Sequence, residues 1–77
     1  MAYKKKQDLA AEYSISERTV HRIYKLIQEQ LGKRYRRDVI IQTGNLIRID
    51  EDVFRDALAN RDLIVRGIAP KFRRYAT

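Results

Sequence analysis

The sequence predicts a small α+β domain, residues 1–77, made of two helices, a β-hairpin and a third helix. Three observations indicate this order. An apolar run at residues 9–13 breaks at residues 14–16, and a longer pattern with helical spacing follows. Residues 39–49 contain two β-branched apolar runs around a Thr-Gly-Asn turn. An acidic stretch at residues 50–52 then precedes a third apolar pattern with helical spacing.

The first two helices are expected at residues 6–13 and 17–31, with Ile15 inside the turn between them. Ser16 is suited to the N-cap position of the second helix, because its hydroxyl can accept a hydrogen bond from a free backbone N–H. Glu17 then places a negative charge at the positive end of the helix. Gly32 is a natural residue for ending it. A helix, a tight turn and a second helix make up a helix-turn-helix motif. DNA-binding motifs of this kind insert their second helix into the major groove.

The second helix has an apolar side and a mostly cationic side. At about 100° per residue, the apolar side carries Val20, Ile23, Tyr24, Ile27 and Leu31, and the opposite side carries Arg18, His21, Arg22, Lys25 and Glu29. Arg18 and Arg22 are four residues apart, so their side chains project together. An ordinary solvated face would have the same composition. The turn before the helix and the charge elsewhere in the chain favour a DNA-reading face.

A basic segment, residues 33–37, joins this helix to the hairpin. It is either a solvated linker or a segment that runs beside a phosphate backbone, and the second interpretation is favoured for Arg34, Arg36 and Arg37. It follows directly on the cationic helix, which is the reason for that preference.

The hairpin is expected to have strands at residues 39–42 and 46–49, with its tip at Thr43, Gly44 and Asn45. Ile47 and Ile49 share one face of the second strand, which should be the core face, so Arg48 should point outward. A helix-turn-helix followed by a hairpin is the order of a winged helix-turn-helix domain. The hairpin is the wing of such a domain.

The third helix should begin after Asp50, which is suited to the N-cap, and end near Asn60. Its apolar stripe is Val53, Phe54, Ala57 and Leu58, and Asp50, Glu51 and Asp52 are explained better by helix capping than by a metal site. The following residues, 63–65, fit either a short strand or a helical continuation.

The two ends of the chain are basic. Residues 1–6 resemble a disordered arm that is either solubilising or in contact with phosphates, and residues 70–77 form a basic-aromatic tail. The tail is either disordered or binds DNA or a protein partner.

The net charge of +7 is unevenly distributed. Residues 1–37 carry ten Lys and Arg against four Asp and Glu, residues 38–60 carry two against five, and residues 61–77 carry five against one. Such a distribution indicates a polyanion-binding surface. Nucleic acid is favoured over an anionic membrane, because a membrane-surface binder needs a long amphipathic helix with aromatic residues on its apolar face. No apolar run is long enough to span a membrane.

The composition also bears on enzyme classes and compartment. With one histidine, no cysteine and no glycine-rich phosphate loop, no catalytic constellation is apparent, and neither a metal nor a cofactor is expected. His21 is interpreted as a groove or surface residue. The absence of cysteine and of a visible signal peptide fits a cytoplasmic protein.

Residues 9–16, Leu-Ala-Ala-Glu-Tyr-Ser-Ile-Ser, and the hairpin at residues 39–49 resemble the excisionase and MerR-like winged-helix family. The resemblance is closest to the small excisionases of conjugative transposons. Val53-Phe54 resembles the start of the family's final helix, so the likeness covers about residues 8–60. The chain departs from the family in its extension at residues 63–77 and in its longer basic linker.

This resemblance implies a recombination directionality factor of a bacterial or phage mobile element, not an enzyme. Such a protein binds repeated sites, cooperatively with further copies, bends or organises the DNA, and biases a tyrosine integrase towards excision. The major groove would receive Arg18, Thr19, Arg22 and Lys25, and the hairpin tip would reach the backbone or minor groove. The complete set of residues expected to bind double-stranded DNA is Ser16, Glu17, Arg18, Thr19, His21, Arg22, Lys25, Arg34, Arg36, Arg37, Thr43, Gly44, Asn45 and Arg48.

Two other functions fit the sequence. A small transcriptional repressor or autoregulator would use the same module, since a fold does not determine the role it serves. A protein-interaction module that uses its basic surface on an acidic partner is the third possibility.

Overall fold

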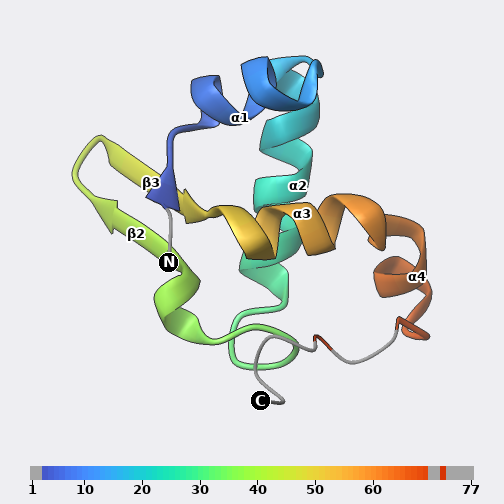
Figure 1. Cartoon of the computed structure of the whole chain (residues 1–77). Coiled ribbons are helices and arrows are strands. Elements are labelled where there is room, and N and C mark those ends of the chain that lie inside the picture. The colour runs from blue at the N-terminus through green and yellow to red at the C-terminus, as the bar shows by residue number, and fades with distance from the viewer. Residues whose placement is uncertain (1–2, 70–71, 73–77) are drawn as a thin grey trace.

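In the computed structural model, which describes residues 3–69 and 72, a three-stranded antiparallel sheet packs against the helices, and its hairpin projects from one side of them (Figure 1). In chain order the elements are β1 (Tyr3–Lys4), α1 (Lys6–Tyr13), α2 (Glu17–Glu29), the 3-10 helix η1 (Arg37–Val39), β2 (Ile40–Thr43), β3 (Leu46–Asp50), α3 (Glu51–Ala59) and α4 (Arg61–Arg66). This confirms the predicted α+β class. In Figure 1, α2 passes behind α3, and the β2–β3 hairpin and α4 lie on opposite sides of the molecule.

The turn between α1 and α2 has the predicted chemistry. Ser14 adopts a left-handed conformation with φ of 54°, and its backbone N–H bonds to carbonyl oxygens of the last turn of α1. Ser16 caps α2, because its hydroxyl oxygen accepts a hydrogen bond from the backbone N–H of Thr19 at 3.1 Å. Ile15 lies between them and packs against the core. The predicted bounds of α1 and the predicted start of α2 are confirmed.

Helix α2 ends at Glu29, two residues before the predicted end. The backbone oxygen of Gln30 accepts hydrogen bonds from the N–H groups of Lys33 and Tyr35, at 3.0 and 3.2 Å, so the chain turns back instead of continuing as a helix. Gly32 lies within this turn with φ of 79°. A glycine therefore marks the end of the helix, as predicted, but from within the loop that follows it.

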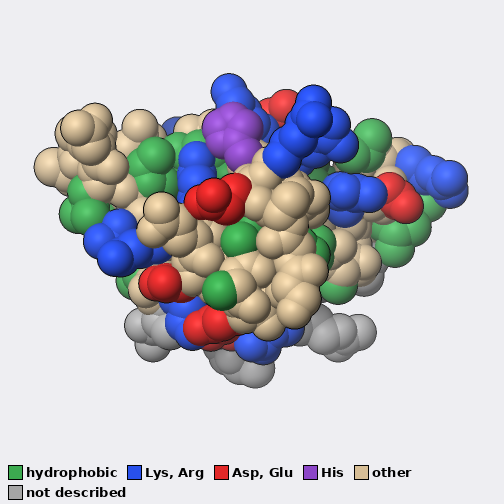
Figure 2. Space-filling view, turned by 90° about the horizontal axis from the view of Figure 1, so that it is seen from above, with side chains coloured by type: hydrophobic (Ala, Val, Ile, Leu, Met, Phe, Trp, Pro, Cys, Tyr) green, Lys and Arg blue, Asp and Glu red, His purple; other side chains and the backbone are tan. Residues whose placement is uncertain are grey.

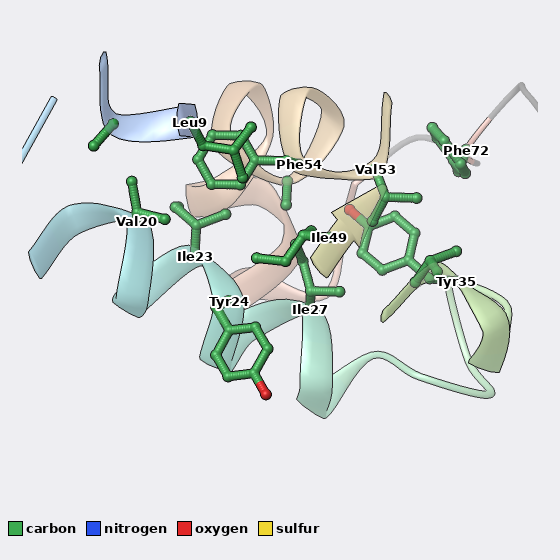
Figure 3. Packing of buried hydrophobic residues seen from close by; sticks show 13 residues of the cluster. Leu9, Val20, Ile23, Tyr24, Ile27, Tyr35, Ile49, Val53, Phe54 and Phe72 are labelled. Carbon is green, nitrogen blue, oxygen red and sulfur yellow. The ribbon is translucent and has the colours of Figure 1, made fainter. Parts of the chain in front are cut away.

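The core lies where α1, α2, α3 and the sheet meet (Figure 3). The predicted apolar stripe of α3 is confirmed, since Val53, Phe54 and Ala57 are fully buried and Leu58 packs against them. Tyr13 of α1 contacts the Phe54 ring edge-on, with ring centroids 5.3 Å apart. The other buried apolar residues of this cluster are Leu9, Ala10, Val20, Ile23, Tyr24, Ile27, Tyr35, Val39, Ile49 and Phe72.

The hairpin pairs β2 with β3, and Ile40 lies opposite Ile49. Its turn contains Gly44, with φ of 58°, and Asn45. A two-residue turn with a positive φ at its first position suits the right-handed twist of the strands. Strand β2 begins one residue later than predicted, because Val39 is buried in η1. Ile49 is on the core face, as expected, and Arg48 is on the opposite face.

The prediction that residues 1–6 form a disordered arm was wrong for the residues that the structure describes. Tyr3 and Lys4 form β1, which pairs with β3, and the following α1 begins at Lys6. The Tyr3 hydroxyl donates a hydrogen bond to the backbone oxygen of Asp38 at 2.6 Å. Lys4 is held by ion pairs with Glu12 and Glu51. Strand pairing and these ion pairs hold Tyr3 and Lys4 against the rest of the domain. The sequence did not predict this strand, because two residues are too few to show a periodicity.

The Lys4–Glu12 ion pair is expected to make the stability of the fold depend on pH in the acid range. A hydrogen bond from Lys4 lowers the pKa of the Glu12 carboxyl and raises the pKa of Lys4. The pKa of the Glu12 carboxyl is lower in the folded state than its ordinary value of 4.5. The ionised carboxylate therefore stabilises the fold above pH 4.5, and this stabilisation is lost as the pH falls through the folded-state pKa. We expect Glu12→Gln to flatten the fall of the urea midpoint between about pH 6 and pH 3. An unchanged slope would contradict the role of this pair.

The chain after α3 is helical again. Residues 63–65, for which the sequence allowed either a strand or a helix, lie in α4, and Gly67, directly after its last residue, adopts a left-handed conformation. Phe72 packs edge-on against Tyr35, with ring centroids 5.4 Å apart, and is buried. The remainder of the predicted basic tail, residues 70–71 and 73–77, lies outside the described residues.

Candidate nucleic-acid interface

One side of α2 carries exposed cationic side chains, because its apolar residues face the core. Arg18, His21, Arg22 and Lys25 are all exposed, and we call these four residues the cationic face of α2. Within the described part of the chain, the side chains of Arg18, Arg22 and Lys25 form no ion pair and no hydrogen bond. Figure 2 looks down on α1 and the start of α2, and it shows Lys and Arg side chains on both sides of the histidine. These cations are therefore accessible to a polyanion.

The residues at the start of α2 are engaged with the helix itself. The hydroxyl oxygen of Ser16 lies 3.0 Å from that of Thr19 and accepts a hydrogen bond from the Thr19 backbone. Glu17 is exposed in the first turn. These three predicted site residues therefore lie next to the cationic face, and the two hydroxyls shape the helix terminus.

Lys6, which the sequence placed in the basic N-terminal arm, adds a cation beside the cationic face of α2. Its Nζ atom lies 3.1 Å from Nδ1 of His21 and 4.1 Å from the centre of the Tyr24 ring. A cation over an aromatic face is attracted by the ring. Fifteen residues separate Lys6 from His21, so no local pattern in the sequence signals the contact.

The hairpin presents its tip to solvent. Thr43, Gly44 and Asn45 are exposed, and no atom lies within 4 Å of the position that a Cβ on Gly44 would take. Arg48 is half-buried on the outer face of the sheet, where its Nη1 donates a hydrogen bond to the backbone oxygen of Ile47 at 3.0 Å. Leu46, on the same outer face, is 42% exposed.

The structure brings the hairpin into direct contact with α2. The Tyr24 hydroxyl donates a hydrogen bond to Oε1 of Gln42 in β2 at 3.2 Å. The same hydroxyl accepts a hydrogen bond from Nε2 of Gln28 at 2.9 Å. A hydrogen bond therefore connects β2, which leads to the hairpin tip, with α2, which carries the cationic face.

Arg34, predicted to contact DNA, instead lies in an internal network. Its side chain is 10% exposed, and its Nε and Nη2 atoms each donate a hydrogen bond of 3.0 Å to the Asp56 carboxylate. The Tyr35 hydroxyl donates to the same carboxylate at 2.7 Å, and Asn60 does so at 3.0 Å. The structure thus contradicts the expected surface position of Arg34. The partly buried carboxylate of Asp56 in α3 attracts it, and that acid lies 22 residues away in the sequence.

The same network shifts the pKa values of its members. Burial raises the pKa of the Tyr35 hydroxyl, and its hydrogen bond to Asp56 adds to the rise. Burial alone would lower the pKa of Arg34, but hydrogen bonds with Tyr35 and Asp56 and the charge of Asp56 outweigh that effect and raise it. Arg34 and Tyr35 therefore keep their protons, and the network anchors the linker to α3.

Arg36 and Arg37 remain on the surface. Arg36 forms an exposed ion pair with Asp38, at 3.2 Å between Nη2 and Oδ2. The guanidinium group of Arg37 lies beside Gly32, where an added Cβ would be 3.1 Å from Nη2. Both follow the C-terminal end of α2, roughly 18 Å along the helix from Glu17. They are not brought together with the start of the cationic face.

Other kinds of site have little support in residues 3–69 and 72. No group of three or more His, Cys, Asp or Glu side chains in these residues could hold a metal ion. An open hollow of about 440 Å³ lies beside α3 and α4, lined by residues that include Leu58, Arg61 and Arg66. Over the same residues, every helix is too short or too polar to cross a membrane.

Comparisons with protein-family models, with curated proteins and with solved structures found no significant match for this chain.

Proposed function

We propose that this protein binds double-stranded DNA sequence-specifically as a winged helix-turn-helix domain, with α2 in the major groove and the β2–β3 hairpin as the wing. The cationic face of α2 carries this proposal. It is exposed and begins in the first turns of the helix, where a recognition helix meets base edges. The serine-capped turn before α2 and the exposed glycine tip of the hairpin support it.

The cations of this surface have different roles in the proposal. Arg22, in the second turn of α2, would read a base edge in this proposal, because a guanidinium can donate two parallel hydrogen bonds to guanine. Lys25 and Lys6 provide point charges for phosphates. The small, exposed tip at Gly44 allows the hairpin backbone to approach the duplex closely.

Salt dependence tests whether the protein binds duplex DNA at all. Each phosphate that a Lys or Arg side chain neutralises releases condensed counterions, so affinity falls as salt rises. With roughly five such contacts, we expect the slope of log affinity against log salt to be about −4 to −5. Fluorescence anisotropy with a labelled duplex measures this slope. A slope near zero would contradict the nucleic-acid proposal.

Within this function, we propose the role of an excisionase-type directionality factor that organises or bends DNA and biases a tyrosine integrase towards excision. The resemblance of residues 9–16 and of the hairpin to small excisionases supports this role. Excision and integration assays with the purified integrase of the same mobile element test it. The expected result is more excision and less integration when the protein is added. If neither direction changes, this role fails and a small winged-helix repressor takes its place.

A further inference from the structure

The ring of Tyr24 lies in the core, and its hydroxyl points out of the core. The residue is 4% exposed, and its ring packs among the buried residues of α2. Figure 3 shows the hydroxyl oxygen pointing away from the centre of the cluster. There it bonds to Gln42 of β2 and Gln28 of α2, at 3.2 and 2.9 Å. One oxygen atom therefore links the helix to the hairpin.

The stability of the core does not require this link. Gln42 and Gln28 are both exposed, so water can replace the Tyr24 hydroxyl as their hydrogen-bond partner. The ring itself would keep its packing and its contact with Lys6 in a Tyr24→Phe variant, because phenylalanine has the same aromatic face. These hydrogen bonds therefore connect the hairpin to α2 without being needed for the packing of the core.

Gln42 is one residue before the exposed tip, and Tyr24 is two residues after Arg22. The Tyr24 hydroxyl thus connects a residue next to the hairpin tip with a residue next to the cationic face of α2. In the proposed function, these two surfaces bind the same duplex. A duplex has a fixed distance between its grooves, so the spacing of helix and tip matters for binding both.

We propose that the Tyr24 hydroxyl is a positioning group that sets the hairpin at a fixed distance from the cationic face of α2, so that both engage one DNA site. The inference rests on the proposed function and assigns it two residues, Tyr24 and Gln42, that do not themselves touch DNA. It predicts that losing the hydroxyl weakens binding to a specific site, where helix and hairpin must act together. Binding to random sequence, which depends mainly on charge, should be unaffected.

The test uses a duplex that the wild-type protein selects from a random pool, with a random duplex of equal length for comparison. Tyr24→Phe and Gln42→Met should each lower affinity for the selected duplex about fivefold, as expected for one neutral hydrogen bond. The double variant should also lose about fivefold, because both changes remove the same bond. Amide hydrogen exchange in β2 and β3 should become faster in Tyr24→Phe while the amides of α2 are unchanged.

Tyr13→Phe is the matched control, because it removes a hydroxyl that accepts a hydrogen bond from Arg55 at 3.4 Å on another side of the molecule. It should change neither affinity. If Tyr24→Phe equals this control on the selected duplex, or weakens both duplexes equally, the positioning role is wrong while DNA binding stands. If the wild-type protein binds no duplex, the proposed function fails and the inference fails with it.

Discussion

Replacing Asp56 with alanine is expected to lower the free energy of unfolding by about 3 kcal/mol, the low end of the cost of breaking a buried ion pair, because the Arg34–Asp56 pair is partly rather than fully buried. The Asp56 carboxylate accepts hydrogen bonds from Arg34, Tyr35 and Asn60. Without it, the charge of Arg34 would remain in a site where its side chain is only 10% exposed. A chain of 77 residues has little stability in reserve, so the effect should be large in urea unfolding followed by circular dichroism.

Asp62→Ala is the control for this prediction. Asp62 also lies in a helix and approaches an arginine, Arg61, at 3.9 Å, but its side chain is 84% exposed. Exposed pairs of this kind contribute at most about 1 kcal/mol. A loss in Asp56→Ala no greater than in Asp62→Ala would mean that the network does not anchor the linker to α3.

Replacing Arg22 with alanine is expected to weaken specific binding by about 1–3 kcal/mol, or about 5- to 150-fold, if its guanidinium reads a base edge. Arg22 is exposed on α2 and forms no ion pair or hydrogen bond within the described residues. Its loss should therefore leave stability almost unchanged, so the effect on DNA can be measured without correction for unfolding. Competition between the selected and random duplexes measures the specificity ratio.

Arg55→Ala is the control for Arg22, because it removes the same charge from an exposed position on α3. Both variants should reduce non-specific binding slightly, since each lowers the net charge by one. Only Arg22→Ala should lower the specificity ratio. Equal ratios in the two variants would exclude Arg22 as a base-reading residue.

The sequence was sufficient to predict features that depend on nearby residues. Ser16 and Asp50 were identified as helix caps because a cap acts within three residues, and both capping bonds are present. The exposed side of α2 could be predicted from helical spacing, because the apolar side of a helix faces the core and the opposite side then faces solvent. The glycine of the hairpin tip followed from its need for a positive φ.

Contacts between distant residues could not be predicted in the same way. Arg34 looked like its neighbours in a basic segment, and only the folded chain brings it to Asp56. Tyr3 and Lys4 form a strand only because β3 offers them a free edge. Lys6 reaches His21, and Tyr24 reaches Gln42, through the packing of elements with no shared local pattern. Each of these depends on tertiary contacts, on which periodicity and composition carry no information.

Selection of bound duplexes from a random pool tests the central claim most directly, because it requires no knowledge of the natural site. The wild-type protein is expected to enrich a defined sequence, and Arg22→Ala is expected to lose preference at one or two positions of that sequence while keeping the rest. Arg55→Ala should enrich the same sequence as the wild type. If the wild-type protein enriches no sequence, or if Arg22→Ala enriches an identical one, α2 does not read DNA as proposed.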